Sequence, residues 1–294
     1  MIITSRAPVR VDFAGGWTDV DIFAKAAGGA VLNAAIDKYV TGKVETREDP
    51  NGDSQGITIS YQSQLPAGSG LGTSSALNVV WLSLVKAQIT NADDRKMIAN
   101  LAYELEAILG ILGGKQDQYA SALGGINFMT FGEKVEVEPL NVPPKVVKEL
   151  EDRLVLCYTG KSRLSGDIHE NVWGAYRRGA PETVDALSTL RNVAFSMRYV
   201  LLLGRLNEFG ELMNENWAAQ KKLDDSITNE QIETLFEEAF KNGAVGGKAC
   251  GAGGGGCVLF FADKGRRTDV EQATEKVGSH IIPFKFEFGG LQIT

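Results

Sequence analysis

Hydrophobic and polar residues alternate through much of the first sixty positions, and β-branched residues are frequent there. A period of two is typical of strands with one buried face. We therefore expect strands at residues 2–5, 9–14, 30–45 (with a break near Asp37) and 56–61.

From residue 74 the apolar positions follow helical spacing up to residue 87. A second helix is expected from about Asp93 to Leu109, with Asn91 or Asp93 as its cap. Glycines between residues 110 and 114 interrupt this pattern. Strands are expected again at residues 126–131 and 135–137.

The second half alternates between strands and longer helices. The expected strands are residues 154–158, 257–262 and 281–288, and the expected helices are residues 165–222 (broken near 179–181), 229–241 and 268–279. Helices packed on one face of a sheet give an α+β fold. No internal repeat or low-complexity linker separates the halves. We therefore expect two closely packed domains, residues 1–155 and 156–294.

Composition narrows the class of protein. The 294 residues are 44% hydrophobic and 23% charged, which suits a full core and excludes a disordered chain. The net charge of −7 argues against nucleic acid as the main partner, although a locally basic pocket can still hold a small anion. No apolar run has the length of a membrane span, and the first residues lack a signal-peptide layout. We expect a cytoplasmic protein without a membrane partner.

Cysteine and histidine usage excludes several kinds of site. Cys157, Cys250 and Cys257 stand in apolar surroundings without zinc spacing, which predicts small core residues of a reduced protein. His169 and His280 are the only histidines in the sequence. Histidine-based metal sites and Ser-His-Asp or Cys-His triads are therefore not expected.

The segment at residues 65–76, LPAGSGLGTSSA, combines three glycines with three consecutive hydroxyl residues before a helix. Glycines let backbone N–H groups approach an anion, and the helix adds its free N-terminal donors and dipole. A hydroxyl in the first turn can coordinate a phosphate-bound Mg²⁺. The segment is neither a Walker A loop nor a dinucleotide-binding motif. It predicts a triphosphate loop, the alternative being a tight turn capped by serine or threonine.

A strand ends in a Gly-Gly turn at residues 7–19, APVRVDFAGGWTD. A carboxylate on such a turn, Asp19, can accept hydrogen bonds from two sugar hydroxyls, and Trp17 can cover the apolar face of a sugar ring. Alternatively, Asp19 caps its own turn and Arg10 forms an ordinary ion pair.

Two carboxylates flank the glycines at residues 110–114. Asp117 lies between two amide side chains and close to Lys115, where it could take a proton from an attacking hydroxyl or orient it. It could instead cap the short helix around Tyr119. Glu106, late on the preceding helix, could serve with a hydroxyl as the sparse protein ligand set of Mg²⁺, and Glu104 is a competitor.

The last motif, residues 248–260, reads KACGAGGGGCVLF and contains Gly-x-Gly-x-x-Gly at 251–256. A nicotinamide-dependent oxidoreductase would need a helix after these glycines, whereas an apolar strand follows. So many glycines carry an entropic cost. They predict a backbone that passes close to another backbone or to a ligand.

These four motifs together resemble those of the GHMP kinase superfamily of small-molecule kinases, and the resemblance covers nearly the whole chain. Residues 9–19 look like the sugar-kinase branch. Residues 35–39, 116–120 and 159–163 are similar to D-glycero-D-manno-heptose 7-phosphate 1-kinases. The form of residues 14–19 also occurs in L-fucokinases.

The resemblance implies the GHMP kinase fold: two closely packed α/β lobes with the active site in the cleft between them. It implies Asp117 as the catalytic base or hydroxyl-orienting residue, with Arg10 beside it, and Ser74 and Glu106 as holders of Mg²⁺. The implied nucleotide-binding residues are Pro66, Gly68, Ser69, Gly70, Leu71, Gly72, Thr73, Ser74 and Ser75. The implied substrate-binding residues are Gly15, Gly16, Trp17, Thr18, Asp19, Gly253 and Gly254. The final glycine-rich segment would buttress the phosphate loop.

Two cations, Lys161 and Arg163, follow the strand at 154–158 and could clamp a distal phosphate on the substrate. The alternative is a pair of solvated loop cations.

The implied function is transfer of the ATP γ-phosphate, with Mg²⁺, to the anomeric C1 hydroxyl of a sugar or sugar phosphate, with heptose 7-phosphate as first candidate. L-fucose or another sugar is the alternative acceptor. A sugar- and nucleotide-binding sensor without catalysis is the non-enzyme alternative, although such a protein would be expected to lose Asp117 or a metal ligand. The partner would be a small molecule, and the chain a monomer or homodimer.

Overall fold

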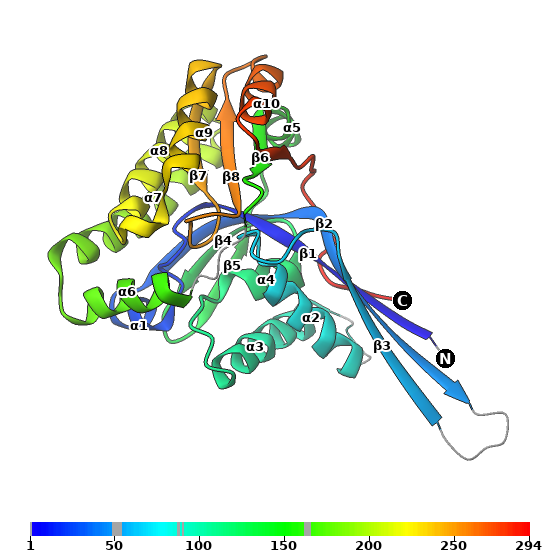
Figure 1. The fold of residues 1–294 in the computed structure, drawn as a ribbon. Helices are drawn as coiled ribbons and strands as arrows, with labels where there is room; N and C mark the ends of the chain where they lie inside the picture. Colours follow the sequence, from blue (N-terminus) through cyan, green and yellow to red (C-terminus); the bar gives the residue numbers. More distant parts are fainter. Residues whose placement is uncertain (1, 49–54, 87–88, 90, 162–165) are drawn as a thin grey trace.

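The computed structural model describes residues 2–48, 55–86, 89, 91–161 and 166–294. Two antiparallel sheets organise the molecule (Figure 1). The first has the order β10-β1-β2-β4-β5, with β3 paired to β2, and the second has the order β7-β8-β6-β9. The strands of the first sheet are β1 (Ile2–Ala14), β2 (Gly29–Glu48), β3 (Gln55–Ser63), β4 (Ile126–Phe131), β5 (Val135–Pro139) and β10 (Gln292–Ile293). Those of the second are β6 (Leu154–Tyr158), β7 (Ala244–Ala249), β8 (Cys257–Ala262) and β9 (His280–Ile281).

Helices cover both sheets and fill the space between them. On one face of the first sheet lie α2 (Thr73–Lys86), α3 (Ala92–Ile108) and α4 (Gln116–Leu123), while α7 (Pro181–Leu202) and α8 (Leu206–Lys221) lie on the other (Figure 1). The other helices are α1 (Asp21–Ala27), α5 (Pro144–Arg153), α6 (Gly166–Arg177), the 3₁₀ turn η1 (Asp225–Ile227), α9 (Glu230–Lys241) and α10 (Arg267–Lys276). The predicted α+β architecture is confirmed. No described helix has both the length and the apolar character needed to cross a bilayer.

Strand β8 is buried on both faces, which explains why its sequence is apolar without alternation. Leu259 and Phe261 point into the main core, whereas Val258 and Phe260 point into a second core under α9 and α10. Successive side chains of a strand face opposite sides, so a strand buried on both faces is apolar throughout.

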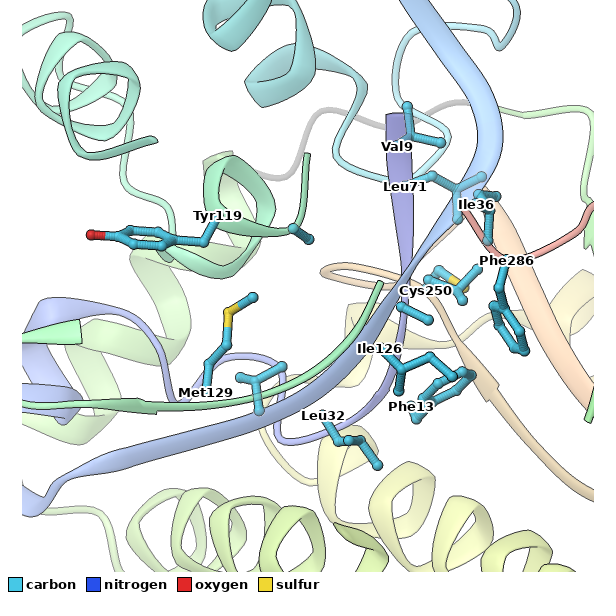
Figure 2. Packing of buried hydrophobic residues seen from close by; sticks show 14 of the residues in the cluster. Val9, Phe13, Leu32, Ile36, Leu71, Tyr119, Ile126, Met129, Cys250 and Phe286 are labelled. Carbon is cyan, nitrogen blue, oxygen red and sulfur yellow. The ribbon is translucent and has the colours of Figure 1, made fainter. Parts of the chain in front are cut away.

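The main core is continuous across both sheets. Figure 2 shows Cys250, which follows β7, packed among side chains from the first half of the chain such as Phe13, Ile36 and Leu71. All three cysteines are buried and unpaired, as predicted, and burial raises the pKa of the Cys157 and Cys250 thiols to about 12. Both lobes therefore share one packed interior at the place where the last glycine-rich segment meets the first sheet.

Several boundaries differ from the prediction. The strands expected at 2–5 and 9–14 are one strand, β1, whose register shifts between Pro8 and Val9, opposite the break expected near Asp37. The strand expected at 281–288 is irregular after β9, apart from a bridge between Ile36 and Phe286. Packing against the first sheet holds this segment in place.

The helical prediction for 165–222 was right about the break near 179–181, where Gly179 has φ +68° and Pro181 opens α7. A second break, between α7 and α8 at Gly204, was not predicted, and the expected start at Ser165 lies outside the described residues. Asn91 is the cap of α3, and its side chain accepts a hydrogen bond from the Asp94 N–H. The short elements α1, α5 and β7 were missed because each is brief and β7 contains two glycines.

Candidate active site

A cavity of about 570 Å³ lies between the end of β1, the loop before α2, the first turn of α4 and the segment after β7. The predicted site residues that line it are Arg10, Gly16, Trp17, Asp19, Gly68, Ser69, Gly70, Gly72, Thr73, Ser74, Ser75, Glu106, Asp117 and Gly253. Residues from four distant stretches of sequence thus meet at one cavity.

The loop before α2 has the geometry of an anion cradle. Gly68, Gly70 and Gly72 have φ values of +72°, +76° and +75°, a region that other residues rarely adopt. Left-handed residues that alternate with ordinary ones turn successive N–H groups toward a common point. The loop then enters α2 at Thr73, so the free N–H groups of the first helical turn face the same cavity.

The second glycine-rich segment, residues 250–257, packs against this loop. The Cys257 N–H donates to the Ser69 carbonyl at 2.8 Å, and a Cβ on Gly70 would lie only 2.6 Å from the Cys250 carbonyl oxygen. A Cβ on Gly256 would lie 2.7 Å from the Ser69 oxygen. The predicted close approach of two backbones is therefore confirmed, and β8 follows these glycines where a dinucleotide-binding site would have a helix.

Asp117, in the first turn of α4, forms an ion pair with Arg10 at the cavity. Arg10 donates through Nε to Asp117 Oδ1 and through Nη1 to the Gly70 carbonyl, both at 2.7 Å. Its Nη2 lies 2.7 Å from the same Asp117 oxygen. Burial raises the pKa of Asp117, and Arg10 opposes this shift. Asp117 also lies against the glycine loop before α2, since a Cβ on Gly72 would be 3.1 Å from Asp117 Oδ2.

Glu106 is a buried carboxylate on α3 that faces the same cavity. Its Oε1 accepts hydrogen bonds from Ser75 Oγ and Asn78 Nδ2, both at 2.9 Å, and its Oε2 accepts from Gln118 Nε2 at 2.8 Å. Burial raises the pKa of Glu106. The competitor Glu104 is exposed, and its carboxylate accepts a hydrogen bond from Asn100.

The donor set around Glu106 fits a magnesium ion. A carboxylate has about four acceptor positions, and the three hydrogen bonds leave one of them for a further ligand. The exposed hydroxyl of Ser74 lies along the same cavity wall. Within the described residues there is no cluster of three or more His, Cys, Asp or Glu side chains that could hold a metal by itself. Mg²⁺ requires no such cluster when phosphate oxygens and waters complete its coordination.

Asp19 lies in the turn after β1, next to the start of α4. Its Oδ2 accepts the Gln116 N–H at 3.0 Å, and Gly114 has no side chain at the point where a Cβ would fall 1.8 Å from that oxygen. Burial raises the pKa of Asp19 to about 6, with a further contribution from the neighbouring Asp117 charge.

Trp17 is only 5% exposed and holds an uncommon positive φ of 79°. Its ring lies 4.4 Å from the His169 ring, centroid to centroid, and 6.0 Å from Trp173. His169 lines the cavity, and burial lowers its pKa to about 4, so it is neutral at physiological pH. The Trp173 Nε1–H donates to His169 Nδ1 at 3.3 Å, which leaves the proton on Nε2.

The other predicted residues, as far as the structure describes them, do not line the cavity. Gly15 and Thr18 shape the turn: the Gly15 N–H donates to Asn216 Oδ1, and the Thr18 hydroxyl donates to the Gly15 carbonyl. Leu71 is a core residue whose carbonyl accepts the Arg10 N–H. Pro66 and Gly254 are absent from the lining, and the Gly254 N–H donates to the Ile227 carbonyl. Lys161 is exposed and does not line the cavity, and Arg163 lies outside the described residues.

Sequence reasoning missed the apolar wall and two charged residues. The apolar wall of the cavity consists of Val40, Tyr61, Leu65, Leu77 and Ile111. Its residues are dispersed along the sequence, so no local motif marks it. Asp12 lines the cavity and pairs with the fully buried Lys248. A charged residue within an apolar strand was the available signal for both.

Comparison with known protein families gives two matches, and both are models of the same family. Residues 32–125 match the model described as the GHMP kinases N terminal domain, and residues 197–280 match the model described as GHMP kinases C terminal.

Two curated proteins resemble the chain in different ways. The chain is 29% identical to the D-glycero-alpha-D-manno-heptose 7-phosphate kinase of Campylobacter jejuni, over 99% of this chain and 98% of that protein. It is 31% identical to the bifunctional fucokinase/GDP-fucose pyrophosphorylase of Arabidopsis thaliana, over 91% of this chain but only 30% of that protein.

Solved structures give the same fold. A D-glycero-D-manno-heptose 1-phosphate kinase from Bacteroides thetaiotaomicron matches with a TM-score of 0.77 at 26% identity, over 99% of this chain and 98% of that chain. The galactokinase of Lactococcus lactis, complexed with galactose, matches with a TM-score of 0.75 over 99% of this chain and 95% of that chain. At 19% identity, the galactokinase match shows the fold alone.

Proposed function

Because the chain belongs to the GHMP kinases, we propose that it transfers the γ-phosphate of ATP to the anomeric C1 hydroxyl of a sugar. The first candidate acceptor is D-glycero-D-manno-heptose 7-phosphate, because the full-length relative from Campylobacter jejuni is named as a kinase of that compound. The matching structure from Bacteroides thetaiotaomicron is named as a kinase of the same heptose, as its 1-phosphate. The observation that carries the proposal is the position of Asp117, which contacts both Arg10 and the glycine loop at one cavity.

The nucleotide would lie along the phosphate loop. The N–H groups of residues 68–73 and of the first turn of α2 would bind the phosphates, since they converge on the cavity and remain free of helical partners. The apolar wall formed by Val40, Tyr61, Leu65, Leu77 and Ile111 suits an aromatic base. Ser74 and Glu106 would hold Mg²⁺, which neutralises charge on the β- and γ-phosphates when bound.

Asp117 would act on the acceptor hydroxyl. A carboxylate next to the phosphate loop can accept the hydroxyl proton as the oxygen approaches phosphorus, and an anomeric hydroxyl is acidic enough for so weak a base. Arg10 would keep Asp117 ionised and fixed, because it contacts both the carboxylate and the Gly70 carbonyl. Most of the acceleration would come from alignment and charge neutralisation.

The sugar would lie beyond Asp117. Asp19 can accept hydrogen bonds from two hydroxyls. The ring pair Trp17–His169 would give an aromatic surface, with His169 Nε2–H as a donor. Lys161 and Arg163 as a clamp for a 7-phosphate remain a prediction. The comparison that tests it is heptose against heptose 7-phosphate, with wild type and Arg163→Ala. Equal use of both acceptors by wild type would remove the clamp.

A coupled ADP-release assay with a panel of acceptors tests the function. The panel contains heptose 7-phosphate, free heptose, L-fucose, D-galactose and mevalonate, and phosphorus NMR of the product identifies the modified carbon. We expect turnover with heptose 7-phosphate and a C1 phosphate. L-Fucose as the best acceptor would support the alternative sugar 1-kinase, which the fucokinase relative favours. Binding of ATP and sugar without any ADP release would support the non-catalytic sensor.

A further inference from the structure

Asp12 on β1 and Lys248 on β7 form an ion pair in the interior of the molecule. They are 236 positions apart in the sequence and are 2% and 0% exposed. Lys248 Nζ also donates to the Asp12 main-chain carbonyl at 3.0 Å, so it binds the strand as well as the carboxylate. Removing two charges from water is costly, and an apolar pair of similar volume is often as stable. Stability alone therefore gives no reason for the pair.

The carboxylate of Asp12 contacts both glycine turns of the site. Its Oδ1 accepts the Gly251 N–H at 3.4 Å, and a Cβ on Gly16 would lie only 2.8 Å from its Oδ2. Gly251 in turn packs on the phosphate loop, since a Cβ on it would be 3.0 Å from the Gly70 oxygen. Asp12 thereby connects the sugar-side turn to the segment that supports the phosphate loop.

The pair is also coupled to the proposed catalytic side chains. Arg10 is two residues before Asp12, so the two side chains leave β1 on the same face. Arg10 reaches Asp117 and the Gly70 carbonyl from there. A continuous series of contacts therefore connects the ion pair to the cavity. It runs from Lys248 to Asp12, from Asp12 to Gly251 and from Gly251 to Gly70. From Gly70 it continues through Arg10 to Asp117.

We propose that Asp12 and Lys248 are a positioning pair, which holds the second glycine-rich segment against the phosphate loop and so keeps Arg10 and Asp117 aligned with the transferred phosphate. The inference rests on the proposed kinase function. It assigns a catalytic consequence to an interaction between the lobes, and neither residue touches the reacting atoms.

Three variants separate positioning from simple stabilisation. Lys248→Met leaves a buried carboxylate without its partner, and Asp12→Asn leaves a buried ammonium, so both single variants should melt at lower temperature. The double variant Asp12→Asn/Lys248→Met has no buried charge there and should recover most of the melting temperature. Its kcat should remain at least about 10-fold below wild type, because small misplacements of aligned groups cost that much or more.

A matched control is Arg153→Met. Arg153 is also a buried cation, donating to the Ala262 carbonyl, but it does not line the cavity. This variant should lose thermal stability and keep the wild-type kcat per folded molecule. A double variant with both wild-type melting temperature and wild-type kcat would overturn the proposal.

Calorimetric binding of Mg·ATP makes the test independent of the acceptor. The double variant should bind Mg·ATP several-fold more weakly than wild type, since the support of the phosphate loop at Gly70 is loosened. If the wild-type protein binds Mg·ATP but turns over no sugar, that result would count against the proposed acceptor class only. Unchanged Mg·ATP affinity in the double variant would overturn the positioning role itself.

Discussion

At the scale of the residue, the carboxylates of the cavity differ in what surrounds them. Asp117 has Arg10 as a direct partner, Glu106 has three neutral donors, and Asp19 has a backbone N–H. Burial raises the pKa of all three, and a cationic partner opposes that rise most directly at Asp117. These surroundings match three distinct proposed tasks: proton acceptor, magnesium ligand and sugar ligand.

Removal of the Asp117 carboxylate should abolish most turnover and spare nucleotide binding. We expect Asp117→Ala to lower kcat by at least ~10²-fold, the lower range for a positioned general base. Mg·ATP affinity, measured by calorimetry, should stay near wild type because the loop amides are unchanged. The control is Glu104→Ala, which removes an exposed carboxylate. Near-normal turnover in Asp117→Ala would show that the assigned role is wrong.

Asp19 should make stability fall with rising pH. Its pKa is about 6 in the folded protein against 3.8 as the ordinary value, so the folded state holds the extra proton between these values. Stability from this group is therefore present below pH 4 and is lost as the pH rises through 6. Two pKa units correspond to at most about 3 kcal/mol. Urea unfolding between pH 4 and 7 should show this slope in wild type and a weaker one in Asp19→Asn. Parallel curves would contradict the shift.

At the scale of the element, the glycine loop before α2 and the glycine-rich segment after β7 constrain each other's backbone. Gly70 needs a left-handed φ and also close contact with Cys250. A residue that meets both conditions tolerates no side chain, which explains why position 70 is a glycine.

Gly70→Ala should therefore affect both stability and nucleotide affinity. The new Cβ would meet the Cys250 oxygen at 2.6 Å and keep a strained φ, at a cost of about 1–3 kcal/mol. Two controls separate the causes: Gly110→Ala has positive φ with open space, and Gly132→Ala has neither constraint. We expect weaker Mg·ATP binding in Gly70→Ala alone. Equal effects on Mg·ATP affinity in Gly70→Ala and Gly110→Ala would show that the strained φ alone, and not the contact with Cys250, causes the loss.

At the scale of the whole molecule, one core spans both sheets, and the cavity lies where the lobes meet. A ligand that contacts both lobes should stabilise the molecule as a unit. The division at residue 155 stays a prediction, and the last strand, β10, pairs with β1 in the first sheet.

Mg·ATP should raise the melting temperature by several degrees. Saturation at about 100 times Kd adds roughly 2.7 kcal/mol, which corresponds to a shift of about 5 °C or more in a chain of this size. NAD should give no shift, since a strand follows Gly251–Gly256. ATP with a chelator should give a smaller shift than Mg·ATP. A larger shift with NAD would contradict the proposed nucleotide.

The sequence determined the local parts of this protein. Glycines and hydroxyls at residues 68–75 specify a loop and a helix start, and apolar runs such as 154–158 and 257–262 specify buried strands, because these features depend on neighbouring residues. Tertiary structure decided which of these parts meet. Packing brought Lys248 to Asp12 and His169 to Trp17, and it placed the residues of the apolar wall at the same cavity as the glycine loop. Contacts between residues so far apart depend on how the sheets and helices pack, and no local pattern records them.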